Sequence, residues 1–203
     1  MPTTDDEFVA QTRAERTRLV GLLEGLGPEQ WQHPSLCRGW RVREVLAHMT
    51  MPYRGSRAGF MAGLIKARFS FDRYADRDAR ATTASTSDAA LVALLRDNID
   101  HPWRPPGGGK AGALSHDVIH GLDMTEPLGL PASPAERVAL VLRNTTARNL
   151  RYFGVDLDGS KLVATDTDVA IGEGTEVRLP VVDLLLVVTG RRTLAAATRG
   201  RAA

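Results

Sequence analysis

The sequence predicts a mainly α-helical protein, in which a bundle of helices is followed by a small C-terminal segment that mixes strand and helix. Apolar residues recur at helical spacing in successive segments up to about residue 150. From about residue 155 the pattern changes to the alternation with a period of two that is typical of strands. We therefore expect two domains, a helical bundle over residues 1–154 and a small α+β appendage over residues 155–203.

The first helix is expected over residues 3–26. Three acidic residues lie in its first turn, where the helix dipole favours negative charge, and leucines recur at helical spacing in its second half. Gly27-Pro28 ends it. After a loop, the apolar residues of 42–49 indicate a second helix, and Pro52 marks its end or a kink.

The middle of the chain is expected to alternate between helices and connections. Helix continues over residues 56–68, whereas the polar residues 70–85 are interpreted as a surface connection. Ser87-Asp88 can cap a short helix, and the proline and glycine residues after position 101 end it. A further helix spans about residues 112–126.

The last helix of the expected bundle begins near residue 133. Residues 133–136, Ser-Pro-Ala-Glu, match a capping box with proline at the first helical position. The apolar residues that follow carry this helix as far as Leu150.

The expected appendage contains strands and one helix. Residues alternate in 161–165 and 176–179 on either side of Gly172-Glu-Gly174, which predicts a small hairpin or meander. Pro180 then starts a helix, and Gly190 stops it.

Composition and charge argue against a nucleic acid or a membrane as partner. The formal net charge is only +2, with 26 basic and 24 acidic residues interleaved along the chain. A basic cluster occurs near the C-terminal end and is interpreted as a solvated tail; it consists of Arg191, Arg192, Arg199 and Arg201. No apolar run approaches the roughly 20 residues that span a bilayer.

Cysteine usage and the N-terminal residues point to the cytoplasm. The single cysteine, Cys37, excludes an intramolecular disulfide and fits a reducing compartment. The first residues are acidic, where a secretory signal would be basic and then apolar.

Three of the five histidines can be connected by physical reasoning. His116 and His120 are four residues apart in one expected helix, hence about 40° apart around its axis and about 6 Å along it. Two imidazoles in this arrangement can reach one metal ion. Such a pair also occurs by chance in unrelated helices.

His48 strengthens the case for a metal centre. It lies one turn beyond the apolar pair Val45 and Leu46, on a side expected to face the interior, where an unpartnered imidazole costs desolvation energy. A divalent metal held by three histidines would remove this cost and leave a coordination position open for water or substrate. The alternative is three core histidines with ordinary hydrogen-bond partners.

Other candidate residues receive different interpretations. His33 and His101 lie in proline-containing loops and are expected at the surface. Asp123 falls on nearly the same helix face as His120 and is a possible fourth ligand or hydrogen-bond acceptor, whereas Asp117 is expected to be solvated. Cys37 is interpreted as a packing residue rather than a nucleophile.

Two motifs resemble those of the mycothiol-dependent maleylpyruvate isomerase family, a branch of the DinB-like metalloprotein superfamily. The segment WQHPSLCRGWRVREVLAHM, residues 31–49, resembles the entry to that family's second helix. The segment HDVIHGLDMTEPLG, residues 116–129, resembles its second metal motif. The C-terminal residues 162–192 are similar to the family's appendage, so that the resemblance covers nearly the whole chain.

The resemblance implies a DinB-like four-helix bundle, a divalent metal such as zinc, and the low-molecular-weight thiol mycothiol as cosubstrate. His48 and His120 correspond to metal ligands of the family. The isomerase pattern has Glu where this chain has His116, and histidine there is the three-histidine form of the wider DinB-like group. This departure keeps metal binding and argues against transferring the isomerase reaction unchanged.

The leading functional hypothesis is a metal-dependent thiol enzyme, a transferase or isomerase in which mycothiol reacts with a small electrophilic substrate. Zinc suits this role because it accepts nitrogen and sulfur ligands and does no redox chemistry. Two alternatives stay open: a non-catalytic metal-binding or stress-response protein with a DinB-like fold, and a metal-dependent hydrolase. The sequence predicts no particular oligomeric state.

Overall fold

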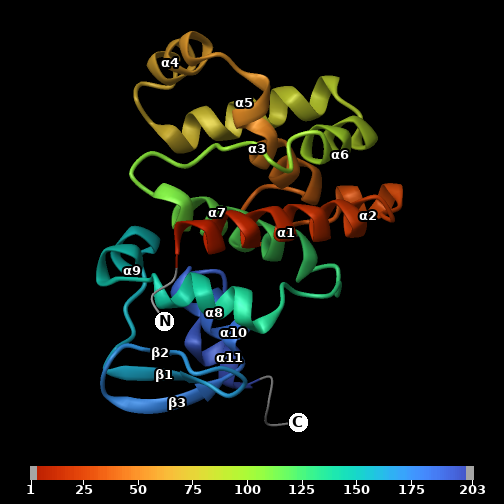
Figure 1. Cartoon of the computed structure of the whole chain (residues 1–203). Helices are drawn as coiled ribbons and strands as arrows, with labels where there is room; N and C mark the ends of the chain where they lie inside the picture. Colours follow the sequence, from red (N-terminus) through yellow and green to blue (C-terminus); the bar gives the residue numbers. More distant parts are fainter. Residues whose placement is uncertain (1–3, 200–203) are drawn as a thin grey trace.

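The computed structural model describes residues 4–199 and confirms a mainly α-helical protein with a small α+β segment at its C-terminal end. Figure 1 shows α4, α5 and α6 at one end of the molecule and the sheet at the other, with α1 and α7 between them. The elements are α1 (Asp5–Leu23), α2 (Pro28–Gln32), α3 (Val42–Arg54), α4 (Arg57–Lys66), α5 (Phe71–Ser85), α6 (Asp88–Arg96), α7 (Gly109–Thr125), α8 (Ala135–Arg143), α9 (Ala147–Phe153), β1 (Ser160–Ala164), β2 (Ala170–Ile171), β3 (Thr175–Leu179), α10 (Val181–Val188) and α11 (Leu194–Arg199).

Four helices form the bundle that carries the three histidines. α1 packs on α7 and α6, and α3 packs on the same two helices, so that the four close into a ring. Buried leucine and valine side chains fill its centre, among them Leu19, Leu23, Val45, Leu46, Leu91 and Leu95. Gly121 of α7 allows close approach to α1, because a Cβ there would lie 3.1 Å from Glu15 Oε1 and 3.2 Å from Leu19 Cδ2.

The prediction of a surface connection over residues 70–85 is wrong, because this segment forms the helix α5. Ser70 caps its N-terminus by accepting a hydrogen bond from the backbone N–H of Arg73. Its buried face consists of small residues, Ala75, Ala79, Thr82 and Thr83, and packs on α3. A stripe without large apolar side chains is easily mistaken for polar loop, although its spacing is helical.

The C-terminal sheet differs from the predicted hairpin. Its strand order is β2-β1-β3, in which β1 pairs with β2 in antiparallel and with β3 in parallel orientation. The two strands predicted from alternation are thus parallel neighbours. The short β2 lies between them in the sequence but pairs with the other edge of β1, where it runs antiparallel. Gly174 permits the turn before β3, because it has φ of +115° and a Cβ there would lie 1.7 Å from the carbonyl oxygen of Gly159.

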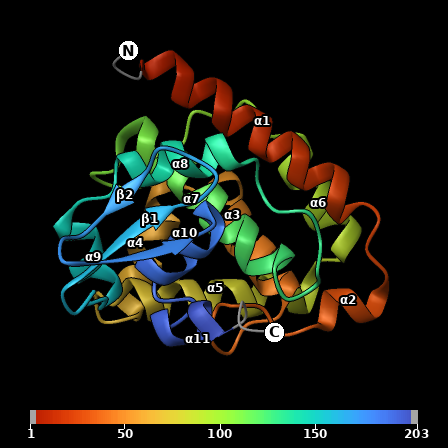
Figure 2. The ribbon, with the colours of Figure 1, turned by 90° about the horizontal axis from the view of Figure 1, so that it is seen from below.

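One apolar cluster joins the sheet to the bundle. α10 packs on β1 and on α8, and α8 packs on α7, whose residues Leu114, Val118 and Leu122 belong to the same cluster. Figure 2 shows α1 along one side of the molecule, with the sheet and α10 lying across the end of the bundle. The division into domains at residue 154 stays a prediction.

The predicted capping box before α8 is wrong in detail. Pro134 occupies the N-cap position, and the Ser133 hydroxyl donates instead to Glu15 Oε2 at 2.8 Å. The helix predicted to reach Leu150 ends at Arg143, and α9 begins after a short break. The buried carboxylate of Glu15 therefore receives the hydroxyl that the sequence pattern assigns to a cap.

The predicted solvated tail is corrected at two of its four arginines. Arg192 forms ion pairs with Glu126 and Asp183, and Arg191 pairs with Asp123. Arg199 is exposed at the end of α11, and Arg201 lies outside the described residues. No helix in residues 4–199 is long and apolar enough to cross a membrane.

Candidate metal centre

The three predicted histidines come together between α3 and α7. His48 is only 7% exposed, and the His116 and His120 side chains are 13% and 15% exposed. One ligand nitrogen of each ring lies within 4.8 Å of the corresponding atoms of the other two. The ring centroids are 4.7 to 5.5 Å apart.

The sequence of α7 explains how two of these rings are presented together. Leu114, Val118 and Leu122 form its apolar stripe and are almost fully buried. The spacing of four residues then places both histidines on an adjoining face, toward α3. His48 follows the buried Val45 and Leu46 on α3, as the sequence predicts.

A buried carboxylate and a buried arginine stand behind His116. Its Nδ1 donates to Asp117 Oδ1 at 2.9 Å, and Arg16 Nε of α1 donates to Asp117 Oδ2 at 2.7 Å. The Arg16 and Asp117 side chains are 1% and 2% exposed, so the prediction that Asp117 is solvated is wrong. Arg16 also donates to three backbone carbonyls, those of Asn98, Ile99 and His101.

The same arrangement stands behind His120, with an arginine from a different part of the chain. His120 Nδ1 donates to Asp123 Oδ2 at 2.9 Å, which supports the prediction of Asp123 as an acceptor. Arg191 approaches this carboxylate with two hydrogen bonds, from Nε to Oδ1 and from Nη2 to Oδ2, each at 3.0 Å. The Cys37 thiol donates to Asp123 Oδ2 at 3.0 Å.

These contacts fix the charge of the groups around the histidines. Burial, and then the neighbouring His120 and His116, lower the pKa of His48 well below its ordinary value. Burial also lowers the pKa of His120, although its hydrogen bond to Asp123 acts in the opposite direction. Burial alone would raise the pKa of Asp123, but the bonds from His120 and Arg191 lower it, so this carboxyl group is ionised.

The donor set fits a divalent metal. Neutral imidazoles bind zinc and other late transition metals, and a hydrogen bond from Nδ1 to a carboxylate leaves the lone pair of Nε2 free. His116 and His120 both have this bond. His48 Nδ1 is buried without a hydrogen-bond partner among the described residues, and a metal ion would satisfy such an atom.

Comparison with known proteins agrees with this architecture. Residues 12–102 match the family model described as the mycothiol maleylpyruvate isomerase N-terminal domain. They contain α3 and His48, whereas α7 lies beyond the matched segment.

Two solved structures share the fold over nearly the whole chain. A crystal structure of the mycothiol-dependent maleylpyruvate isomerase matches with a TM-score of 0.61 and 13% identity, over 95% of this chain and 91% of that chain. A variant of that enzyme with one histidine replaced by alanine matches with a TM-score of 0.63 and 14% identity, over 94% and 91% of the two chains. No curated protein matches this chain.

Aromatic side chains surround the histidines. The rings of Trp40 and Phe71 lie 5.2 and 6.3 Å from His48, and Trp103 lies 5.0 Å from His116, measured between centroids. Trp40 Nε1 donates to Asp76 Oδ1 of α5 at 2.8 Å. Asp76 is one of the residues that line a groove of about 780 Å³ along α5, together with Asp72, Arg73, Arg77, Arg80 and Ala81.

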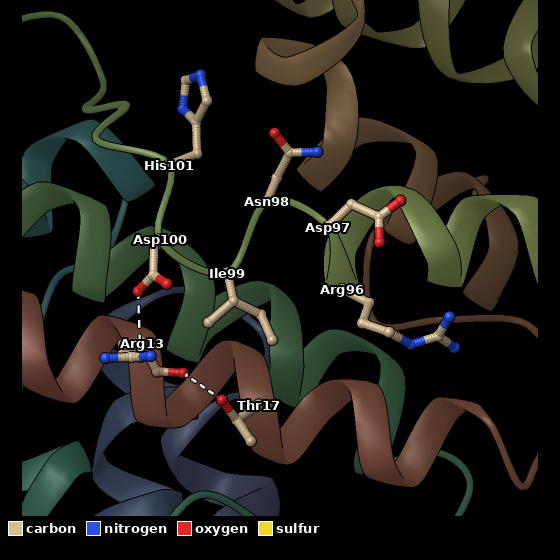
Figure 3. Close-up of a pocket in the computed structure, with 8 residues that line it drawn as sticks. All are labelled: Arg13, Thr17, Arg96, Asp97, Asn98, Ile99, Asp100 and His101. Carbon is tan, nitrogen blue, oxygen red and sulfur yellow. Dashed lines mark hydrogen bonds and ion pairs between the residues drawn. The ribbon is translucent and has the colours of Figure 1, made fainter.

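A second cavity, of about 420 Å³, lies between α1 and the segment after α6 and contains none of the three histidines. Figure 3 shows the ion pair between Arg13 and Asp100, and the His101 ring pointing away from both residues. Arg96, which also lines this cavity, pairs with Glu24. The two arginines of this cavity, Arg13 and Arg96, are therefore already paired with carboxylates. The histidine cluster is the better candidate site.

Sequence reasoning missed the supporting residues more than the histidines. His33 is exposed, as predicted, and His101 is half-buried, with its Nδ1 accepting from the backbone N–H of Trp103. Arg16 could have been suspected, because it occupies the apolar face of α1 three residues before Leu19. Arg191 has no such signal, because its partner lies 68 residues away in the sequence.

Proposed function

We propose that this protein is a metal-dependent enzyme that uses a low-molecular-weight thiol, mycothiol, to act on a small electrophilic substrate. The cluster of His48, His116 and His120 carries the proposal, since three imidazole ligand atoms lie within 4.8 Å of one another. The match of residues 12–102 to the mycothiol maleylpyruvate isomerase N-terminal domain model supports the choice of thiol. The reaction would be S-transfer, or addition followed by isomerisation and release.

The proposed metal is zinc, held by His48, His116 and His120. Zinc bound by three protein ligands supplies an open coordination position and lowers the pKa of a thiol bound there. Zinc accepts imidazole nitrogen and thiolate sulfur alike and does not promote oxidation of the thiol. The chain's own Cys37 does not compete for this role, because burial and the neighbouring Asp123 raise the pKa of its thiol.

The protein side chains would orient the ligands and shield the site. Asp117 and Asp123 hold the rings of His116 and His120 by their Nδ1 atoms, which keeps Nε2 as the basic nitrogen of both. Trp40, Phe71 and Trp103 present apolar rings beside the histidines, which would reduce the access of water. An electrophile could then meet the thiol in surroundings that disfavour hydrolysis.

Elemental analysis tests the first premise. Protein prepared without a histidine tag should contain about one divalent metal ion per chain, or should take up one zinc ion after treatment with a chelator and dialysis. His33→Ala is the matched control, because it removes an exposed histidine whose Nδ1 contacts only the adjacent Pro34 carbonyl among the described residues. A chain that neither contains nor binds metal would refute the proposal.

A thiol-dependence assay tests the chemistry. The zinc-loaded protein is incubated with a panel of electrophiles, with mycothiol, glutathione, cysteine or no thiol, and formation of thioether or isomer is followed. Acceleration with mycothiol should be lost in His48→Ala and kept in His33→Ala. Metal-dependent turnover that needs no thiol would instead indicate a hydrolase, and metal binding without turnover on any substrate would indicate a binding protein.

A further inference from the structure

We infer that Arg191, in the C-terminal segment after α10, is a positioning residue for the proposed metal centre. It fixes the carboxylate of Asp123, and Asp123 fixes the ring of His120. This inference rests on the proposed function, because it concerns the same three histidines. It means that the C-terminal segment helps to build a site whose ligands all lie in the helical bundle.

The contacts of Arg191 leave little freedom to the guanidinium. Nε and Nη2 donate hydrogen bonds to the two carboxylate oxygens of Asp123, each at 3.0 Å. Nη1 donates to the carbonyl oxygen of Thr189 at 2.9 Å. The guanidinium also lies over the Phe153 ring, 5.4 Å from its centroid. A two-pronged contact of this kind fixes orientation as well as distance.

Asp123 depends on Arg191 more than on its other partners. His120 and Cys37 both bond to Oδ2, so Arg191 Nε is the side-chain donor to Oδ1. The Asp123 side chain is fully buried. Without Arg191 its carboxylate would keep partners on one oxygen only and could rotate, and the Nδ1 of His120 would follow it.

The end of α10 determines where Arg191 lies. Gly190 adopts φ of +71°, and the backbone N–H of Arg191 donates back to the carbonyl oxygen of Leu186 at 2.8 Å. A Cβ at position 190 would come within 3.3 Å of the carbonyl oxygen of Phe153. The turn after α10 is therefore shaped to direct Arg191 toward α7.

The neighbouring Arg192 provides a matched control. It also joins this turn to α7, through an ion pair with Glu126 at 2.6 Å, and it pairs with Asp183 of α10. Within residues 4–199 it forms no hydrogen bond or ion pair with the histidines or their carboxylate partners. Loss of Arg192 removes a similar attachment of the C-terminal segment without touching the proposed centre.

The test compares zinc affinity in wild type, Arg191→Gln, Arg191→Lys and Arg192→Gln by competition with a chromophoric chelator. Arg191→Gln should lower the affinity about tenfold, the lower end of the range for partners of metal ligands. Arg191→Lys keeps the charge but not the two-pronged contact, and should fall between. Arg192→Gln should match wild type, and the visible spectrum of bound Co²⁺ should change in the Arg191 variants alone.

Urea unfolding of the metal-free variants separates positioning from general stability. If Arg191→Gln does not fold, Arg191→Lys carries the comparison. Equal zinc affinity and Co²⁺ spectra in Arg191→Lys, Arg192→Gln and wild type would overturn the inference while leaving the metal centre standing. If the wild-type chain itself binds no zinc or Co²⁺, the proposed function fails, and the role of Arg191 fails with it.

Discussion

His116 and His120 stand on one helix, one turn apart, yet the carboxylates behind them are held by different parts of the chain. Asp117 is held by Arg16 of α1, inside the bundle, through a pair that is 1% and 2% exposed. Asp123 is held by Arg191 of the C-terminal segment, whose side chain is 15% exposed. We call the first set, His116, Asp117 and Arg16, the inner arm, and the second, His120, Asp123 and Arg191, the outer arm.

The two arms show how one short segment of α7 can connect a metal site both to α1 and to the C-terminal segment. In each arm a guanidinium neutralises the carboxylate, so that the imidazole meets an oriented acceptor at little cost in buried charge. The inner arm needs only the packing of α1 on α7. The outer arm also needs the turn after α10, so the proposed centre would be complete only when the C-terminal segment is docked.

The largest expected effect is the loss of a metal ligand, and it should be the same in both arms. His116→Ala and His120→Ala should each weaken zinc binding by more than about 100-fold, the upper end for partners that do not touch the metal, because each removes a ligand. Chelator competition measures this, with His33→Ala as control. Wild-type affinity in either variant would exclude that histidine as a ligand.

The next effect should separate the arms in the stability of the metal-free protein. Asp117→Asn leaves the guanidinium of Arg16 buried without its counter-charge, which should lower the free energy of unfolding by about 3–5 kcal/mol. Asp123→Asn should cost less, because Arg191 is closer to solvent. Urea unfolding of both variants measures the difference, and a larger loss for Asp123→Asn would reverse our view of the two arms.

Hydrogen exchange should locate the coupling to the C-terminal segment. Zinc should slow amide exchange in residues 181–192 as well as in α7, because binding stabilises the arrangement that includes the Asp123–Arg191 contact. In Asp123→Asn, this slowing should persist in α7 and disappear from residues 181–192. Slowing confined to α7 in the wild type would show that the outer arm does not transmit binding.

The smallest expected effect lies outside both arms. Trp40→Phe keeps an aromatic ring beside His48 but loses the hydrogen bond to Asp76, so zinc affinity should not change. The KM for the electrophile should rise, because the smaller ring covers less of the space beside His48 in which the substrate is proposed to bind. A loss of zinc affinity as large as that of Asp123→Asn would assign Trp40 to the support of the metal ligands.

Local patterns predicted the features of this protein that depend on neighbours in sequence. The mainly helical fold, the caps at Ser87 and Gly190, and the shared face of His116 and His120 follow from helical spacing and turn residues. The approach of His48 to this pair was expected from its interior position on another helix. The helix α5 was missed because its buried face is made of alanine and threonine. These side chains carry little of the apolar signal on which the spacing argument depends.

The carboxylate and arginine partners could be predicted only in part. Asp123 lies three residues from His120 on one face, so its role as acceptor is a local feature. Asp117 was misjudged, because neighbouring residues in a helix do not normally face each other and its burial depends on α1. Arg191 reaches its partner only after the sheet and α10 have folded onto the bundle.

X-ray absorption at the zinc edge tests the central claim most directly. The zinc-loaded protein should show three imidazole nitrogens and one further light atom at about 2.0–2.1 Å. Addition of mycothiol should replace the light atom by one sulfur at about 2.3 Å, with the three imidazoles retained. Fewer than three imidazoles, or no sulfur at saturating thiol, would contradict a three-histidine centre that binds a thiol.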